Sequence, residues 1–153
     1  MLSSKTIRFA GAADFDQWFP LWQAYNRFYG RSEATALAED ITQATWTRFH
    51  NADEPMYCIV AESGGHLVGL VHFIFHRTTI SIAPTCYLQD LFILESERGK
   101  GVGRMLIEAV YEQARLAGSA RVYWLTHETN SAAMQLYDKV ADRSGFLQYR
   151  KSL

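Results

Sequence analysis

The sequence predicts one α/β (α+β) domain that spans residues 1–153, and three observations support this prediction. Hydrophobic residues make up 48% of the chain, which is enough for a domain of this length to bury roughly two thirds of its unfolded surface. Apolar runs at 56–61 and 67–75 flank the turn Ser63-Gly64-Gly65, an order typical of a β-hairpin. A strand-like run at 87–94 leads into a glycine-rich loop and then a helical apolar pattern. No linker separates these parts, so no second domain is expected.

The first third of the chain predicts one strand and two helices. Residues 6–10 alternate between apolar and polar side chains, as a strand does, and residues 35–49 repeat apolar side chains at helical spacing. Between them, Asp14 or Asp16 offers an N-cap to a first helix. Pro20 is expected to kink or restart that helix, because proline has no N–H to donate.

Aromatic residues of the first helix recur at intervals of four, three and four. This spacing places them on one face, which predicts a stripe that packs on the core. The stripe consists of Trp18, Trp22, Tyr25 and Tyr29.

The loop at 98–104 places three glycines and three cations in seven residues, and a helix predicted over 102–116 follows it. Glycines let the backbone approach a ligand closely, and the start of a helix adds the positive end of its dipole. The expected ligand is a phosphate. The cations and glycines of this loop are Arg98, Gly99, Lys100, Gly101, Gly103 and Arg104, with Val102 between the last two glycines.

Two common phosphate-binding loops are excluded by spacing. A P-loop requires Ser or Thr after its Gly-Lys pair, whereas Gly101 follows Lys100 here. A dinucleotide-binding loop requires Gly-x-Gly-x-x-Gly and an acidic residue about 20 positions later. The glycines here lie at 99, 101 and 103, and Ser119-Ala120-Arg121 occupies the distal position.

The last quarter predicts a buried strand at 121–126 and a helix capped by Asn130. Asn130 is a favourable N-cap residue. Tyr137 lies seven positions after Asn130 and therefore shares its helix face.

Charge and cysteine content exclude several classes of function. With 15 basic and 16 acidic residues the net charge is −1, so we expect neither a nucleic-acid surface nor a membrane-binding patch. Residues 1–5 are too polar for a signal peptide, and no apolar run approaches the roughly 20 residues of a membrane span. Cys58 and Cys86 have no metal-binding or redox spacing. Free buried thiols suit a reducing cytoplasm, which is the expected location.

Three histidines suggest a metal site but lack the necessary spacing. In a strand, His72 and His76 lie about 13 Å apart, which is too far to bind one ion. His66 has no carboxylate or cysteine partner at ligand spacing. We therefore expect surface or pocket-lining histidines and no metal site.

At this point the sequence resembles the GNAT (general control-related N-acetyltransferase) superfamily. Arg98, Gly101 and Gly103 match its Arg-x-x-Gly-x-Gly motif, residues 130–137 match its Asn-x-x-Ala-x-x-x-Tyr helix, and residues 144–151 look like its C-terminal strand. Within the superfamily, Tyr-Leu-Gln-Asp-Leu-Phe-Ile together with residues 130–137 looks most like the branch of polyamine acetyltransferases and small yeast histone and polyamine acetyltransferases. The resemblance implies a mixed, mostly antiparallel twisted sheet of about six to seven strands, with a splayed central strand pair and about four flanking helices.

The resemblance also implies acetyl-coenzyme A as cosubstrate. The glycine loop 98–104 would wrap its pyrophosphate, and Asn130 would bind its pantetheine arm. The arm would also pair with the main chain of the central strand, much as a peptide adds to a sheet edge. The strand residues that match are Leu91, Phe92 and Ile93.

Two residues are candidates for the chemistry. An attacking amine must be neutral although an alkyl ammonium has a pKa near 10, and the departing thiolate needs a proton. Tyr137 is the candidate acid for the thiolate. Similar polyamine enzymes carry Glu-Asp where this chain has Gln89-Asp90, so Asp90 is the candidate base or ammonium-binding group. His127 or Glu128 is the alternative.

The sequence thus predicts an acetyl-coenzyme A-dependent N-acetyltransferase that acts by direct transfer to a primary amine. The acceptor is a small amine, a polyamine or a protein lysine, and Tyr25 and Tyr29 are expected to wall its pocket. A non-catalytic acyl-coenzyme A-binding regulatory module is the alternative. The branch resemblance and the apolar terminal segment 146–149 predict a homodimer, since an unpaired terminal strand would expose an edge.

Overall fold

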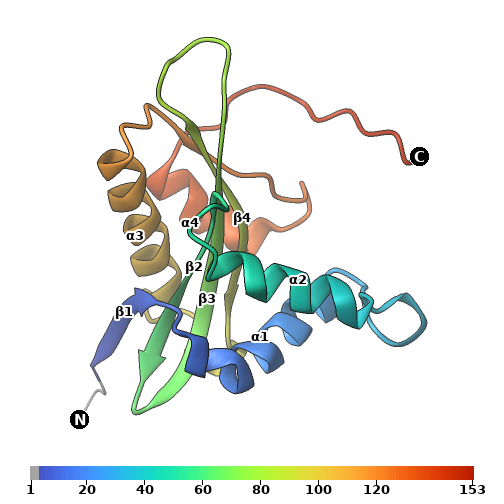
Figure 1. The fold of residues 1–153 in the computed structure, drawn as a ribbon. Helices are drawn as coiled ribbons and strands as arrows, with labels where there is room; N and C mark the ends of the chain where they lie inside the picture. The colour runs from blue at the N-terminus through green and yellow to red at the C-terminus, as the bar shows by residue number, and fades with distance from the viewer. Residues whose placement is uncertain (1–3) are drawn as a thin grey trace.

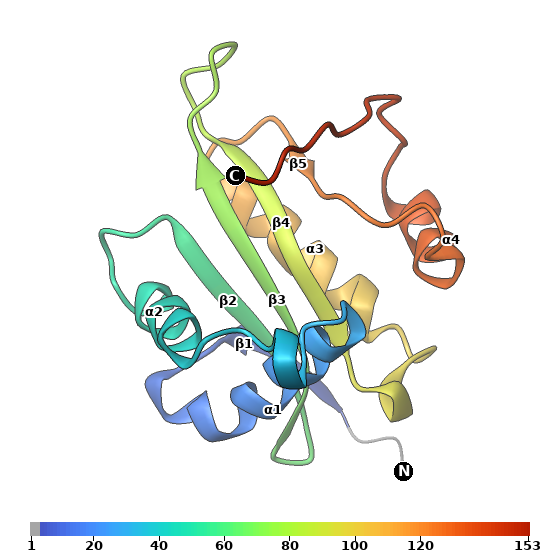
Figure 2. The same cartoon turned by 90° about the vertical axis from the view of Figure 1, so that its right-hand side faces the viewer.

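The computed structural model describes residues 4–153 and contains one mixed five-stranded sheet between two layers of helices (Figures 1 and 2). The strands lie in sequence order, and every neighbouring pair is antiparallel except β4 and β5, which are parallel. This confirms the mixed, mostly antiparallel sheet that the sequence predicts, with fewer strands than expected. The strands are β1 (Lys5–Phe9), β2 (Met56–Ser63), β3 (His66–His76), β4 (Thr85–Ile93) and β5 (Val122–Tyr123).

Four α-helices flank the sheet, as predicted, with α1 and α2 on one face and α3 and α4 on the other (Figures 1 and 2). None of the helices in the described part of the chain is long and apolar enough to span a membrane. The helices are α1 (Phe15–Phe28), α2 (Glu39–Phe49), α3 (Val102–Leu116) and α4 (Ser131–Val140).

The α1 and α2 helices differ from the prediction at two points. The α1 helix continues through Pro20 without a restart. Pro20 and Asp16 are both exposed, so water can bind the Asp16 carbonyl that lacks an N–H donor. The α2 helix begins at Glu39 instead of residue 35, because Thr35 ends a short 3₁₀ turn in which its Oγ1 donates to the Gly30 carbonyl at 2.6 Å.

Two apolar clusters hold the layers together. On the α3 face, Phe73 and Leu106 lie in a cluster with residues from β2, β4 and α3. On the α1 face, Trp18 is 0% exposed and packs against Trp46 with ring centroids 4.7 Å apart. Trp22 and Tyr25 are also buried, which confirms the aromatic stripe, and Tyr29 at its end is 43% exposed. Burial of each large side chain stabilises the fold by about 2 kcal/mol or more.

The predicted hairpin between β2 and β3 is present, and β4 contains a bulge. Gly64 and Gly65 have φ of 57° and 79°, the left-handed values that a tight hairpin turn requires. On the other side of β3, His72 pairs with Asp90 and Phe73 pairs with Leu88. Gln89 is therefore an unpaired bulge residue.

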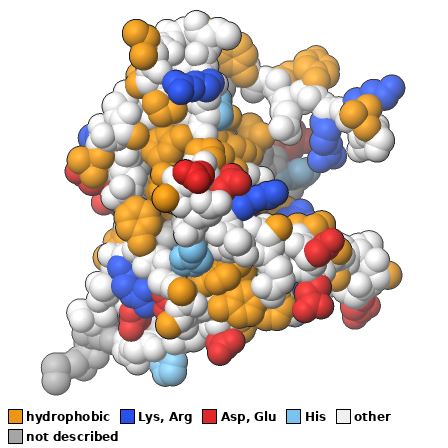
Figure 3. All heavy atoms as spheres, in the orientation of Figure 1, with side chains coloured by type: hydrophobic (Ala, Val, Ile, Leu, Met, Phe, Trp, Pro, Cys, Tyr) orange, Lys and Arg blue, Asp and Glu red, His pale blue; other side chains and the backbone are white. Residues whose placement is uncertain are grey.

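The predicted closing strand at 144–151 is not formed, and this explains why the sheet has five strands. After Val140 the chain leaves the body and runs outward (Figure 1), and the space-filling view shows it protruding with apolar side chains exposed (Figure 3). Phe146 and Tyr149 are 90% and 93% exposed. The apolar pattern at 144–151 favours a strand, but a strand requires a neighbour, and β5 is too short within this chain to provide one.

Candidate active site

The edge of β4 that faces β5 is open over most of its length. Pairing between β4 and β5 stops at Tyr87 and Tyr123, so the two strands splay apart, as predicted. On the opposite edge the Leu94 N–H donates to the Val68 carbonyl at 2.9 Å. Since main-chain groups alternate between the two edges of a strand, the N–H and C=O groups of Leu91 and Ile93 face the open edge. Those of Phe92 face β3.

The glycine loop brings unpaired amides to the end of this open edge. Gly99 and Gly101 have φ of 74° and 82°, a conformation that glycine adopts without strain. The first helical hydrogen bond of α3 runs from the Met105 N–H to the Gly101 carbonyl. The N–H groups of residues 102–104 precede that bond and have no partner within the helix. They form the positive end of the α3 dipole.

Gly103 has a packing role in addition to the ligand-binding role expected for it. A Cβ added at Gly103 would lie 3.2 Å from Leu136 Cδ2 on α4, whereas a Cβ at Gly101 would meet nothing within 4 Å. Gly103 therefore allows α3 and α4 to pack closely. Of the three glycines in the loop, Gly99 and Gly101 have the open space that a ligand could fill.

Each of the three cations of the loop contacts a nearby residue. The Arg98 Nε donates to the Ile93 carbonyl at 3.1 Å, and its guanidinium lies 5.7 Å from the centroid of the Phe92 ring. Lys100 pairs with Glu97 at 3.4 Å.

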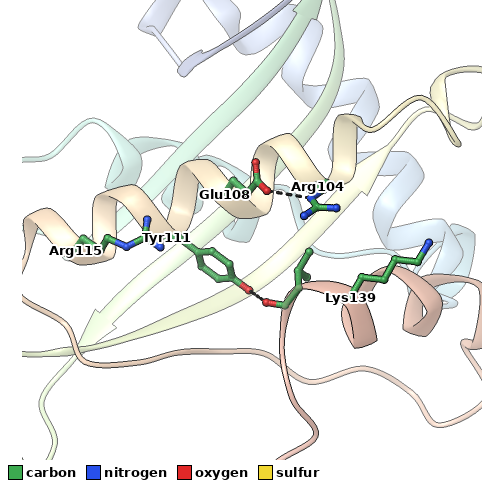
Figure 4. A pocket seen from close by; sticks show the side chains of 6 residues that line it. Arg104, Glu108, Tyr111, Arg115 and Lys139 are labelled. Atoms are coloured by element: carbon green, nitrogen blue, oxygen red, sulfur yellow. Dashed lines mark hydrogen bonds and ion pairs between the residues drawn. The ribbon is translucent and has the colours of Figure 1, made fainter.

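Arg104 pairs with Glu108 at 3.0 Å. Both side chains line a hollow of about 410 Å³ between α3 and α4 (Figure 4). Lys139 of α4 lies on the other side of this hollow (Figure 4). Positive charge thus continues from the loop into the hollow between the two helices.

The β4 bulge directs Asp90 to the α1 face. Cys86 and Leu88, at alternate positions, lie in the cluster on the α3 face. Without the extra residue Gln89, Asp90 would continue that alternation and point into the apolar α3 side. The bulge instead places Gln89 and Asp90 together at a hollow on the α1 and α2 side.

Asp90 is held by a buried hydrogen-bond chain. The Trp18 Nε1–H donates to His72 Nε2 at 3.0 Å, and His72 Nδ1 lies 2.9 Å from Asp90 Oδ2. His72 is 3% exposed. Because the indole N–H can only donate, His72 Nε2 must accept. His72 therefore carries its proton on Nδ1, is neutral, and donates to the Asp90 carboxylate.

The hollow beside Asp90 has a volume of about 390 Å³ and contains one cation, Arg31. Burial, followed by the negative charge of Asp90, raises the pKa of the Tyr25 phenol, and Arg31 opposes this rise. Burial, followed by the negative charge of Asp90, also raises the pKa of Tyr29, and Arg31 opposes this rise. Tyr25 and Tyr29 thus lie beside both charges. The hollow is lined by Trp22, Asn26, Arg31, Leu37, Ile41, Thr45, Phe49, Met56, His72, Ile74, Gln89 and Asp90.

Tyr137 of α4 faces the same region from the opposite side of the open edge. Its ring packs against Trp124 at 5.4 Å between centroids. Burial, followed by the nearby Tyr29, raises the pKa of Tyr137 to about 12. The phenol is therefore protonated at neutral pH and able to donate a proton.

The remaining predicted site residues lie in the loop before α4. Asn130 is at the N-cap position, but its side chain makes no capping hydrogen bond. His127 and Glu128 are exposed and do not line the hollow that contains Asp90. His127 Nδ1 instead lies 2.7 Å from Thr129 Oγ1.

Sequence reasoning missed Trp18 and Arg31 as site residues. Trp18 follows the pattern of a core residue, and Arg31 stands in a polar turn, so neither carries a sequence signal. His72 was expected at the surface or lining a pocket, and it lines the hollow from a buried position. No group of three His, Cys, Asp or Glu side chains within residues 4–153 is placed to hold a metal ion.

Comparison with known proteins gives a consistent result. Residues 16–141 match the acetyltransferase (GNAT) family model. The chain is 32% identical over 141 residues to the D-amino-acid N-acetyltransferase HPA3 of Saccharomyces cerevisiae, covering 91% of this chain and 85% of that protein. It is 26% identical over 165 aligned positions to the thialysine N-epsilon-acetyltransferase of Mus musculus, covering 97% and 93%. The fold is similar to that of AAC(6')-Iy in complex with the bisubstrate analog CoA-S-monomethyl-acetylneamine, with a TM-score of 0.81, 19% identity and coverage of 99% and 100%.

Proposed function

The chain belongs to the acetyltransferase (GNAT) family, and from this premise we propose that it transfers the acetyl group of acetyl-coenzyme A directly to a primary amine bound beside Asp90. The protein is an N-acetyltransferase, and acetyl-coenzyme A is its cosubstrate. The observation that carries the proposal is the position of two opposed groups. Asp90 lines the hollow on the α1 face of the sheet, and Tyr137 packs against the apolar cluster on the α3 face.

The residues around the open edge fit the cosubstrate. The free amides of residues 102–104, with Arg98 and Arg104 beside them, suit a pyrophosphate at a helix N-terminus. Gly99 and Gly101 leave open space where a side chain would stand. The main-chain groups of Leu91 and the N–H of Ile93 face the open edge and suit the amides of the pantetheine arm, whereas the Ile93 carbonyl already accepts from Arg98. Asn130 has no capping bond, so its side chain is available to the same arm.

Lys100 and Lys139 extend the positive surface of this cosubstrate site. Lys100 lies in the loop itself and is 51% exposed. Lys139 lies across the hollow from Arg104, where positive charge favours a further phosphate.

The proposed reaction is balanced in atoms and protons. The bound ammonium first releases one proton to solvent, and the neutral amine then attacks the carbonyl carbon of the thioester, so that a nitrogen–carbon bond forms. The carbon–sulfur bond breaks, and the sulfur takes the Tyr137 proton. The amine nitrogen loses a proton to Asp90, directly or through water. The products are an N-acetyl amide and the free thiol, and the two protein groups return to their starting states by exchange with solvent.

His127 and Glu128 are less suited than Asp90 to accept the amine proton, because they stand in an exposed loop outside the hollow. Gln89 cannot accept the proton, but as the bulge residue it lines the hollow and can hydrogen-bond the acceptor. Tyr25 and Tyr29 form an aromatic wall next to Asp90, which suits an alkyl ammonium before it loses its proton.

The acceptor is proposed to be a small molecule. The two curated relatives above act, by their names, on D-amino acids and on thialysine. A hollow of about 390 Å³ lies within the range of small-molecule sites.

Release of free thiol from acetyl-coenzyme A in the presence of a panel of amines tests the proposed function. We expect turnover with at least one small amine, and the Asp90→Asn variant should lose it about 100-fold or more while binding coenzyme A normally. Asp53→Asn, in an exposed turn, is the matched control and should keep full activity. Tight binding of acetyl-coenzyme A without turnover of any amine would instead indicate a regulatory module.

The proposed assembly is a homodimer formed through the C-terminal segment. Residues 144–153 are exposed in the single chain and include Phe146, Leu147 and Tyr149, each more than 80% exposed. Such side chains are stable in water when a partner covers them.

A further inference from the structure

The hollow beside Asp90 contains a second charged group, of opposite sign. Arg31 follows α1, lines the hollow together with Asp90, and forms no ion pair with any residue from 4 to 153. A primary amine alone needs only the carboxylate, so the role proposed for Asp90 leaves Arg31 unexplained.

Arg31 is held in place by a buried amide whose orientation is determined by its partners. The Asn26 Nδ2 donates to the Trp22 carbonyl at 2.9 Å, which requires the Asn26 Oδ1 to point the other way. That oxygen accepts from Arg31 Nε at 2.7 Å. Asn26 is 5% exposed, so the side chain that holds Arg31 belongs to the core.

The flat face of the Arg31 guanidinium is also fixed. Its Cζ lies 5.8 Å from the centroid of the Tyr25 ring and 5.5 Å from that of Tyr29. With Nε bonded to Asn26 and the plane over two rings, only the two terminal nitrogens are free to bind a ligand. Two parallel N–H groups on one guanidinium match the two oxygens of a carboxylate.

Resting on the proposed function, we infer that the acceptor is a zwitterionic free amino acid, whose carboxylate binds the terminal nitrogens of Arg31 while its amine lies at Asp90. Arg31 is a specificity-determining residue, and Asn26 positions it. A polyamine lacks the carboxylate and brings a second ammonium toward Arg31. A lysine within a protein chain has no free α-carboxylate.

Matched pairs of acceptors test this inference: lysine against cadaverine, ornithine against putrescine, and phenylalanine against phenethylamine. Each pair differs by the carboxylate alone. We expect the wild-type kcat/KM to favour at least one amino acid over its decarboxylated partner by about 10- to 100-fold. Arg31→Gln should abolish that preference by lowering kcat/KM for the amino acid and leaving the amine unchanged or improved.

Arg27→Gln is the matched control, because Arg27 is exposed on α1 and does not line the hollow. It should keep the preference. Asn26→Ala removes the group that orients Arg31 and should weaken the preference in the same direction as Arg31→Gln.

Calorimetric titration of the coenzyme A-bound protein with the same pairs separates this inference from the proposed function. Binding of an amino acid that depends on Arg31, in a protein that acetylates no amine, would overturn the proposed function and support the carboxylate site. Equal acetylation of amines with and without the carboxylate would overturn the carboxylate site and leave the proposed function standing.

Discussion

His72 Nδ1 lies 2.9 Å from Asp90 Oδ2 inside the α1 face of the sheet, and the Trp18 indole determines which histidine nitrogen carries the proton. The arrangement fixes the Asp90 carboxylate without adding a charge. His72→Leu removes the donor, so we expect kcat/KM to fall roughly 10- to 100-fold through misplacement of Asp90, with coenzyme A affinity unchanged. Steady-state kinetics and calorimetry measure the two quantities.

His72→Asn separates positioning from packing. An asparagine can present an N–H close to the place of Nδ1, so it should restore most of the activity that leucine loses. Nitrogen NMR of wild-type His72 should show the proton on Nδ1. If His72→Leu and His72→Asn have equal activity, His72 does not act on Asp90.

The glycine loop yields a second prediction. Gly101→Val should abolish coenzyme A binding, because the side chain would enter the space open to the pyrophosphate and φ of 82° strains any residue with a Cβ. Gly65→Val, at a φ of 79° with nothing within 4 Å of its Cβ, introduces the same strain outside the loop. Coenzyme A affinity measured by calorimetry should be normal in this control. If Gly101→Val also binds normally while folded, the pyrophosphate lies elsewhere.

Local pattern was sufficient to predict much of this structure. The α3 helix occupies the residues predicted for it, the hairpin turns at Gly64 and Gly65, and the glycine loop lies at the N-terminus of α3. These features depend on neighbouring residues only. The direction of Asp90 depends on the bulge at Gln89, which is defined by pairing with β3. The role of Arg31 depends on Asn26, whose side chain is buried by tertiary packing.

The third prediction concerns Tyr137 as the acid. Tyr137→Phe removes the hydroxyl and keeps the ring against Trp124, so the fold and coenzyme A affinity should be preserved. Turnover should fall roughly 100-fold or more, as expected for the loss of a general acid. Single-turnover kinetics should show the loss in the chemical step. Unchanged chemistry across pH in this variant would remove Tyr137 from the mechanism.

The same residue predicts a pH dependence of stability. The folded state raises the pKa of Tyr137 from 10.0 to about 12, so between these values the folded protein retains a proton that the unfolded chain has lost. The contribution of Tyr137 to the free energy of unfolding is therefore complete below pH 10 and declines as the pH rises toward 12, by up to about 2 kcal/mol. Tyr137→Phe should not show this part of the decline. Urea unfolding of the wild type and of Tyr137→Phe at pH 8 to 11.5 measures the difference.

The last prediction is that removal of residues 144–153 converts a dimer into a monomer. In the single chain this segment follows α4 and carries Phe146 and Tyr149 into solvent at 90% and 93% exposure, an arrangement that a covering partner would stabilise. Light scattering at micromolar concentration should give a mass near twice 17.5 kDa for the full chain and near the monomer mass for the shortened chain. Substitution of Phe146, Leu147 and Tyr149 by serine should have the same effect without changing the length, because the segment would lose the apolar side chains that a partner covers. A full chain that scatters as a 17.5 kDa particle would show that the exposed segment does not join two copies.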